Sequence, residues 1–128
     1  MEDLIAIANA LSGVFYIATA DENQPHVRPF DGAAVVDGYL YIGTNNTKDV
    51  YKQIEKNPKV EIFSMEQGIV RFTAEAYPVD DKKLNEKAYT AIGKEYSDDC
   101  VALKLKNMRG VFTDSMGEKT NFIINAAD

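Results

Sequence analysis

Apolar and polar residues alternate along most of this chain, the period-two pattern typical of half-buried β-strands. The longest example is the segment 69–79, in which Val70, Phe72, Ala74 and Ala76 are expected to face inwards and the residues between them outwards. Further strands are expected at 14–19, 26–36, 39–43, 60–65, 101–106 and 119–124, with 109–113 continuing or pairing with the strand before it.

Three segments have apolar residues at helical spacing instead. The first helix is expected to begin with Asp3 as its cap and to end at Gly13, and the third to begin at Asp80-Asp81 and to end at Gly93. Between them, Asn46 or Thr47 is expected to cap a helix that ends at Asn57-Pro58. The predicted buried faces are Leu4, Ile7, Ala8 and Leu11; Val50, Tyr51 and Ile54; and Leu84, Ala88, Ala91 and Ile92.

The segment 26–57 combines a β-hairpin with the start of a helix. Asp37-Gly38 is a strong signal for the hairpin turn. Without a bulge, the strand before it would place His26, Arg28, Phe30, Gly32, Ala34 and Val36 on one face. The small residues 32–34 indicate a bulge in that strand, or a place where a flat ligand or another backbone approaches closely.

Hairpin-connected strands with helices at the corners predict a single domain, residues 1–128, that is mainly β with flanking helices. The expected architecture is an antiparallel sheet closed into a barrel. A composition of 45% hydrophobic and 27% charged residues is that of a soluble globular protein, with no apolar run that could span a bilayer.

Charge and cysteine content narrow the functional classes. A formal net charge of −6 argues against nucleic-acid binding, which depends on clustered Lys and Arg. The acidic N-terminal segment does not resemble a signal peptide, and one cysteine, Cys100, agrees with a reducing compartment. We therefore expect a cytoplasmic protein.

Several familiar catalytic arrangements are absent from the sequence. There is no phosphate-binding glycine loop, no dinucleotide fingerprint and no nucleophile elbow. A single histidine, His26, and a single cysteine cannot assemble a His/Cys metal site within one chain. No metal site is therefore expected, and no catalytic residue can be named.

Arg28 and Lys48 suggest an anion site. Arg28 is a long cation in a strand beside a run of small residues, where the core does not need it, and Lys48 falls in the first turn of the predicted helix. A helix N-terminus offers free N–H groups and the positive end of the dipole, so a phosphate would fit between the two. Both residues are also compatible with ordinary solvated charges.

Four segments resemble the FMN-binding split-barrel family of pyridoxamine 5′-phosphate oxidase-like flavoproteins, in its short bacterial branch. They are GVFYIATADENQPHVRPF, DGYLYIGT, NNTKDVYKQIEKNPKVEI and RFTAEAY, and the resemblance extends from about Ser12 to Ile124. It implies a split β-barrel and a homodimer with FMN at the subunit interface. It also implies that Arg28, Thr47 and Lys48 bind the FMN phosphate, while Pro29, Phe30, Asp31, Gly32 and Ala33 run beside the flavin ring and Ile42, Gly43 and Thr44 line its other side.

The family's name-giving activity is not expected here. Pyridoxamine 5′-phosphate oxidases carry a C-terminal segment with Trp and an Arg-containing motif for the substrate phosphate, whereas this chain has no Trp and ends in NFIINAAD. The resemblance instead implies an FMN-dependent oxidoreductase that acts on an unidentified small substrate, such as a nitroaromatic compound, or on an electron carrier. The alternatives are a non-catalytic, stress-related module that binds flavin or haem, and a barrel without a cofactor.

Overall fold

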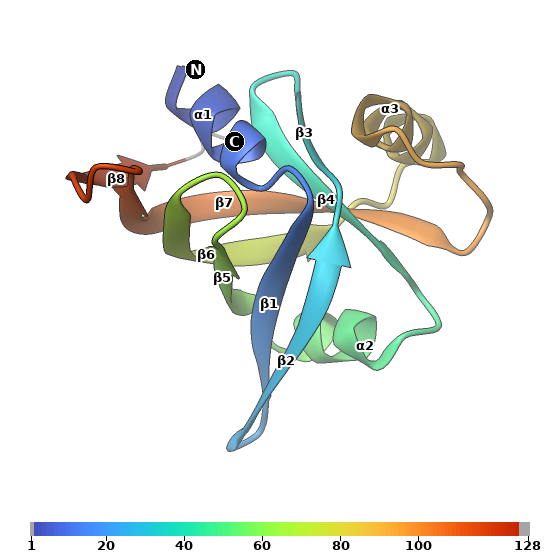
Figure 1. The fold of residues 1–128 in the computed structure, drawn as a ribbon. Coiled ribbons are helices and arrows are strands. Elements are labelled where there is room, and N and C mark those ends of the chain that lie inside the picture. The colour runs from blue at the N-terminus through green and yellow to red at the C-terminus, as the bar shows by residue number, and fades with distance from the viewer. Residues whose placement is uncertain (1, 126–128) are drawn as a thin grey trace.

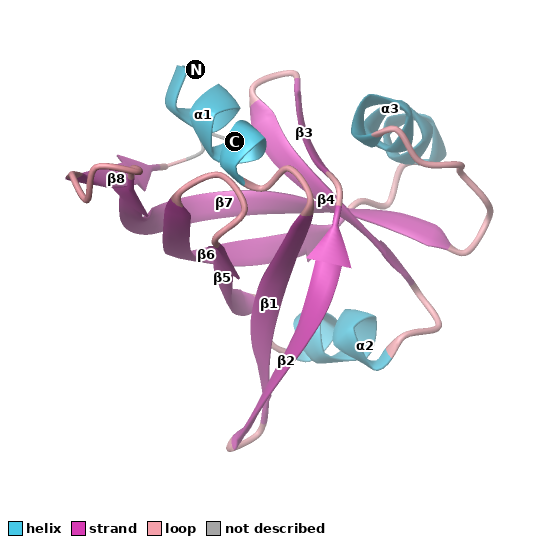
Figure 2. Ribbon diagram, viewed as in Figure 1, coloured by secondary structure: helices cyan, strands magenta, loops and turns pink. Residues whose placement is uncertain are grey.

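The computed structural model describes residues 2–125 and contains eight strands and three helices in that range. Figure 2 shows that strands make up most of the structure. In chain order the elements are α1 (Glu2–Ala10), β1 (Val14–Asp21), β2 (Gln24–Asp31), β3 (Ala33–Val36), β4 (Tyr39–Asn45), α2 (Asp49–Lys56), β5 (Lys59–Ser64), β6 (Ile69–Pro78), α3 (Lys82–Ile92), β7 (Cys100–Thr113) and β8 (Lys119–Ile124).

The strands form one antiparallel sheet in the order β2-β1-β5-β6-β7-β4-β3, and β8 pairs with β7. Strand β7 is long enough to pair with two strands on the same side. It pairs with β4 along Cys100–Leu105 and with β8 along Met108–Thr113. Asn107 separates these halves with a φ of 53°, a left-handed conformation that asparagine tolerates. In the described residues the two edge strands, β2 and β3, do not pair, so the sheet is split and the expected closure of the barrel is wrong.

The main hydrophobic core lies inside the curved sheet. Strand β6 contributes to it as the alternation predicted, with Val70, Phe72, Ala74 and Ala76 all buried. Helix α1 contacts β3, β4, β6 and β8, and α2 contacts β1 and β6. In Figure 1, α1 lies above the sheet, α2 lies below it and α3 lies to its right. There α3 covers a second, smaller core formed by Val36, Tyr41, Ala88, Tyr89 and Ala102.

The predicted turns are confirmed. Asp37 and Gly38 have φ values of 51° and 84°, which suit the tight β3–β4 hairpin, and Gly93 ends α3 in a left-handed conformation. The hairpin between β1 and β2 and the end of α2 before Pro58 also lie where they were expected.

Strand 26–36 does not keep its alternation. The strand breaks at Gly32, whose φ is 96°, and the break shifts the following residues by one position. Phe30, Ala33 and Val35 therefore pack against the main core, while Val36 belongs to the core under α3. The prediction of a single face joining Arg28 to Ala34 and Val36 is therefore wrong. At the small residues the structure has a break between two strands at opposite edges of the sheet, not a bulge within one strand.

Three details of the helices differ from the expectation. Asp3 lies inside α1 and does not cap it, because the helix already includes residue 2. Tyr51 is only half-buried beside the buried Val50 and Ile54. On α3, Ala91 is exposed and the buried residues are Asn85, Ala88 and Tyr89. Asn85 is tolerated there because its side chain donates to the Val79 carbonyl (3.0 Å) and accepts from the Ala102 N–H (2.8 Å).

Candidate functional site

The guanidinium of Arg28 is held on the inner side of β2 by uncharged groups. Its Nη1 donates to the hydroxyl of Thr19 (2.8 Å) and to the carbonyl of Ile17 (3.3 Å), and its Nη2 donates to Oε1 of Gln53 (2.7 Å). The Thr19 hydroxyl also donates to Gln53 Oε1 (2.6 Å). These bonds connect β1, β2 and α2 and fix the direction in which the cation points.

Arg28 is a half-buried cation without a carboxylate partner in residues 2–125. Partial burial lowers the pKa of its guanidinium, and the charge of Asp49 in the first turn of α2 opposes that shift. An arginine nevertheless remains protonated in proteins. Among the described residues Arg28 forms no ion pair, although Arg71, Lys87 and Lys94 do. A cation placed in this way favours an anionic ligand near the start of α2.

The start of α2 differs from the expectation in one respect. Lys48 is itself the N-cap residue, with extended backbone and no side-chain cap hydrogen bond, so the prediction of Asn46 or Thr47 is wrong. Thr47 is folded back on Asn45, whose Oδ1 accepts from the Thr47 N–H (3.0 Å) and from its hydroxyl (2.7 Å). Lys48 is exposed, which leaves its ammonium accessible to a ligand at the helix N-terminus.

Only the end of the first segment expected beside a flat ring, 29–33, lies next to the second, 42–44. Pro29 and Asp31 belong to β2 at the other edge of the sheet. Ala33 on β3 pairs directly with Ile42 on β4. The side chain of Ile42 is fully buried in the main core, and Phe30 packs there against Phe15 with ring centroids 6.0 Å apart. Ile42 therefore offers a ligand its backbone only, whereas Pro29 and Asp31 are exposed.

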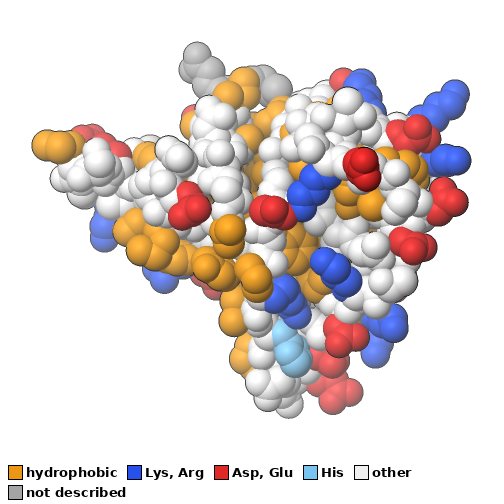
Figure 3. Space-filling view, turned by 45° about the vertical axis from the view of Figure 1, so that its right-hand side comes forward, with side chains coloured by type: hydrophobic (Ala, Val, Ile, Leu, Met, Phe, Trp, Pro, Cys, Tyr) orange, Lys and Arg blue, Asp and Glu red, His pale blue; other side chains and the backbone are white. Residues whose placement is uncertain are grey.

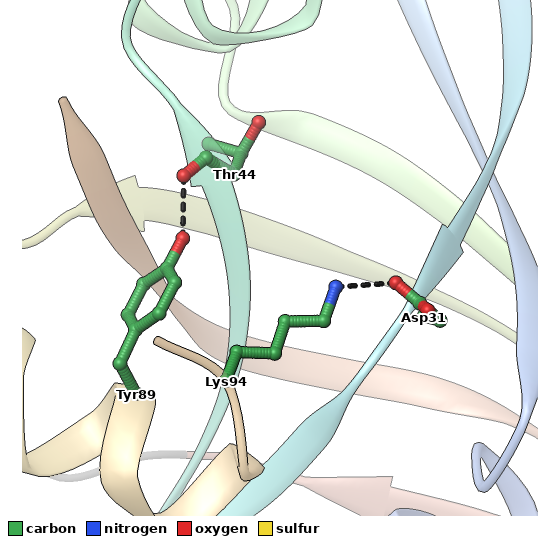
Figure 4. A network of polar contacts seen from close by, with 4 residues as sticks. All are labelled: Asp31, Thr44, Tyr89 and Lys94. Carbon is green, nitrogen blue, oxygen red and sulfur yellow. Dashed lines mark hydrogen bonds and ion pairs between the residues drawn. The ribbon is translucent and has the colours of Figure 1, made fainter. Parts of the chain in front are cut away.

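Thr44 carries an unsatisfied polar atom. The residue is 5% exposed. Among the buried side-chain oxygen and nitrogen atoms of residues 2–125, Oγ1 of Thr44 is the one that has no hydrogen-bond partner. Because buried polar groups are nearly always paired, this hydroxyl fits a site completed by a ligand with polar atoms, such as a flavin. The carbonyl of Thr44, by contrast, accepts a 2.5 Å hydrogen bond from the Tyr89 hydroxyl (Figure 4).

Helix α3 and the residues just after it contact both segments that were expected beside the ring, 29–33 and 42–44, which we call the ring-side segments. Tyr89 fixes β4 at Thr44 and leaves no room for a side chain at Gly43, where an added Cβ would lie 2.9 Å from the Tyr89 hydroxyl oxygen. Just beyond the end of the helix, Lys94 forms an ion pair with Asp31 at the end of β2. Figure 4 shows both contacts, with the Lys94 side chain extended between the strand of Thr44 and that of Asp31.

Four residues of this arrangement are additions to the predicted set: Thr19, Gln53, Tyr89 and Lys94. Thr19 could have been found from the sequence, because it follows Phe15 and Ile17 at inward positions of β1 and is polar. Gln53 lies between the buried Val50 and Ile54 on α2, a weaker signal. Tyr89 and Lys94 gave no local signal, because their partners are 45 and 63 residues away in sequence.

The described part of the chain contains no cluster of three or more His, Cys, Asp or Glu side chains that could hold a metal ion. None of the helices there is long and apolar enough to cross a bilayer.

Comparisons with known proteins agree with the resemblance in the sequence. The family model for pyridoxamine 5′-phosphate oxidase matches residues 5–119. The solved structure of a NimC/NimA family protein from Clostridium acetobutylicum is 35% identical, with a TM-score of 0.84 over 97% of this chain and 92% of that one. No curated protein matches the sequence.

Two more distant structures share the fold. An FAD-binding protein from Mesorhizobium loti is 17% identical, with a TM-score of 0.60 over 78% of this chain and 84% of that one. A haem-binding protein from Mycobacterium smegmatis is 14% identical, with a TM-score of 0.64 over 91% of this chain and 55% of that one.

Proposed function

The chain belongs to the pyridoxamine 5′-phosphate oxidase family of split-barrel proteins, and on that basis we propose that it binds FMN and acts as a flavin-dependent oxidoreductase on a small substrate. The observation that carries this proposal is Arg28, a half-buried cation that contacts α2 through Gln53 and has neutral partners only among the described residues. A phosphate monoester is the anion best matched to an arginine beside a helix N-terminus.

In this proposal the residues have two tasks. Arg28, Thr47, Lys48 and the first N–H groups of α2 bind the phosphate. The backbone of the ring-side segments 29–33 and 42–44 orients the flavin, and the hydroxyl of Thr44 gains the partner that it lacks within the described chain. A bound flavin would supply the electron-transfer chemistry, while the protein fixes its position and limits access to it.

FMN affinity tests the proposal. The double variant Arg28→Ala/Lys48→Ala should bind FMN roughly 100-fold more weakly or worse, because two charge-assisted contacts are lost. Arg71→Ala/Lys56→Ala is the matched control, since it also removes one Arg and one Lys and both side chains are exposed. Equal FMN affinity in the two double variants, measured by fluorescence titration, would refute the phosphate site.

The proposed assembly is a homodimer with the cofactor at the subunit interface. It is supported by an apolar outer face of the sheet, where Val14 and Tyr16 are 40% and 42% exposed and Val27 is 69% exposed. Figure 3 shows hydrophobic side chains gathered in a band on that surface. Sedimentation at twice the monomer mass is the expected result. The single cysteine is in keeping with the proposed location in the cytoplasm.

A second candidate is a binding module without rapid turnover that holds flavin or haem. Its support is the shared fold of the haem-binding and FAD-binding proteins, and His26, half-buried on β2, is the one histidine that could ligate a haem iron. The absorption spectrum of the purified protein separates flavin from haem. Reduction of the bound cofactor by NAD(P)H, followed by reoxidation with a nitroaromatic acceptor, separates an enzyme from a carrier.

A further inference from the structure

The backbone of Lys94 is fixed by the cap of α3. Gly93 has a φ of 91°, and its N–H donates to the carbonyls of Tyr89 (2.9 Å) and Thr90 (3.1 Å). The N–H of Lys94 then donates to the same Tyr89 carbonyl (3.1 Å), the pattern of a Schellman cap. Since Tyr89 is also bonded to Thr44, the starting point of the Lys94 side chain is fixed relative to β4.

The Lys94 side chain then crosses the corner between β2 and β3. A Cβ added at Gly32 would lie 3.3 Å from Cε of Lys94 and 2.6 Å from Cγ2 of Ile92, so this glycine lets both side chains pass over it. The ammonium pairs with Asp31, and the side chains of the pair are 40% and 66% exposed. A cation is thereby placed at the middle of the segment that is proposed to run beside the flavin ring.

We propose that Lys94 is a residue of the cofactor site that favours the reduced state of the bound flavin. This inference rests on the proposed function. When a flavin accepts two electrons and one proton, its ring gains one negative charge. A fixed cation beside the ring stabilises that charge, and a carboxylate such as Asp31 opposes it. The ion pair therefore balances the field at the ring, and removing either partner shifts the balance in a known direction.

The chain provides a matched control on helix α3 itself. Lys87 of α3 forms an ion pair with Asp37 at 3.0 Å, and the side chains of that pair are 59% and 68% exposed. Asp37 lies in the hairpin turn between β3 and β4, outside both ring-side segments. Lys87→Met thus removes the same charge and the same kind of contact from α3, but at a position where no effect on the flavin is expected.

The test is the reduction potential of bound FMN, measured by titration with dithionite against a reference dye. Lys94→Met should lower the potential, with at least a tenfold change in the ratio of reduced to oxidised flavin, about 30 mV for a two-electron couple. Asp31→Asn should raise it, and the double variant should lie between the two. Lys94→Arg, which keeps the charge, and Lys87→Met should stay close to the wild type.

Opposite shifts in the two single variants cannot arise from a general loosening of the site, because loosening would move both in one direction. Lys94→Gln replaces Lys94→Met if thermal unfolding shows that the methionine variant does not fold. A potential unchanged by either neutral substitution, or moved equally by Lys87→Met, overturns the role of Lys94 while the flavin site stands. A wild-type protein that binds no FMN overturns the proposed function as well.

Discussion

Replacement of Tyr89 by Phe tests the contact between α3 and β4. The change removes one hydroxyl and leaves the Thr44 carbonyl without the donor that lies 2.5 Å from it. Both residues are buried, Tyr89 being 4% exposed and Thr44 5%, so water cannot readily replace that donor. Burial also raises the pKa of the Tyr89 hydroxyl above its ordinary value, so the group is protonated and a donor at neutral pH.

The expected cost is about 1 kcal/mol of unfolding free energy, the usual net contribution of one hydrogen bond, because Thr44 keeps its pairing with Val101 in the β4–β7 ladder. At about 2.1 cal/mol/K per residue, a chain of 128 residues has an unfolding entropy of roughly 0.27 kcal/mol/K near its midpoint. The melting temperature should therefore fall by about 4 °C, which calorimetry or circular dichroism would measure.

Tyr96→Phe is the control for this experiment. The ring of Tyr96 lies edge-on to that of Tyr89, with centroids 5.9 Å apart, so the substitution removes a second hydroxyl from the same aromatic pair. We expect a change in melting temperature of less than about 2 °C, in the range of an ordinary surface substitution. If both variants melt at the same temperature, the Tyr89 hydrogen bond contributes nothing to the attachment of α3, and the reasoning is refuted.

Two further predictions concern the corner at Gly32 and a carboxylate on β6. Gly32→Ala should lower the free energy of unfolding, measured in urea, more than Gly93→Ala does. Both glycines have φ values above 90°, but only a Cβ at position 32 would meet Ile92. Equal losses of unfolding free energy would mean that backbone strain alone decides the cost. Hydrogen bonds from Tyr77 (2.5 Å) and Asn107 (3.1 Å) lower the pKa of Glu75 in the folded state. The charge of Glu75 therefore stabilises the folded state when the pH is above the unfolded-state pKa of about 4.5. This stabilisation is lost as the pH falls through the lower pKa of the folded state. Glu75→Gln should therefore be less stable than the wild type near neutral pH, and the difference should vanish in acid; a difference that persists there contradicts this account.

Local signals in the sequence predicted most elements of the fold. The Asp37-Gly38 turn, the glycine at the end of α3 and the alternation along β6 each depend on the conformational preferences of a few neighbouring residues, and all were confirmed. The phase of β3 was missed because one residue in a left-handed conformation, Gly32, inverts every side chain after it. The small residues indicated a bulge or a close approach there, but not a break between two strands at Gly32.

The buried face of α3 shows a different limit. Hydrophobicity favoured Ala91, yet the structure buries the polar Asn85 and the phenol of Tyr89. Each of them satisfies backbone groups on distant strands, Ala102 on β7 and Thr44 on β4. A pattern of hydrophobic positions contains no information about which carbonyl or N–H on another strand needs a partner, so these two positions could not be read from the helix alone.

The same reasoning explains why the proposed phosphate end of the site leaves a clearer signal in the sequence than the proposed ring end. Arg28 and Lys48 are charges that local structure does not require, and such residues are visible in the sequence. The ring end depends on α3, which follows β4 by 36 residues and contacts Thr44, Gly32 and Asp31 within two turns of its C-terminal end. Because one helix end contacts both ring-side segments, a substitution that displaces it should alter the ring environment while leaving the contacts of Arg28 intact. Spectral shifts of bound FMN without loss of affinity are therefore the expected signature of changes in α3, and loss of affinity is the signature of changes in α2.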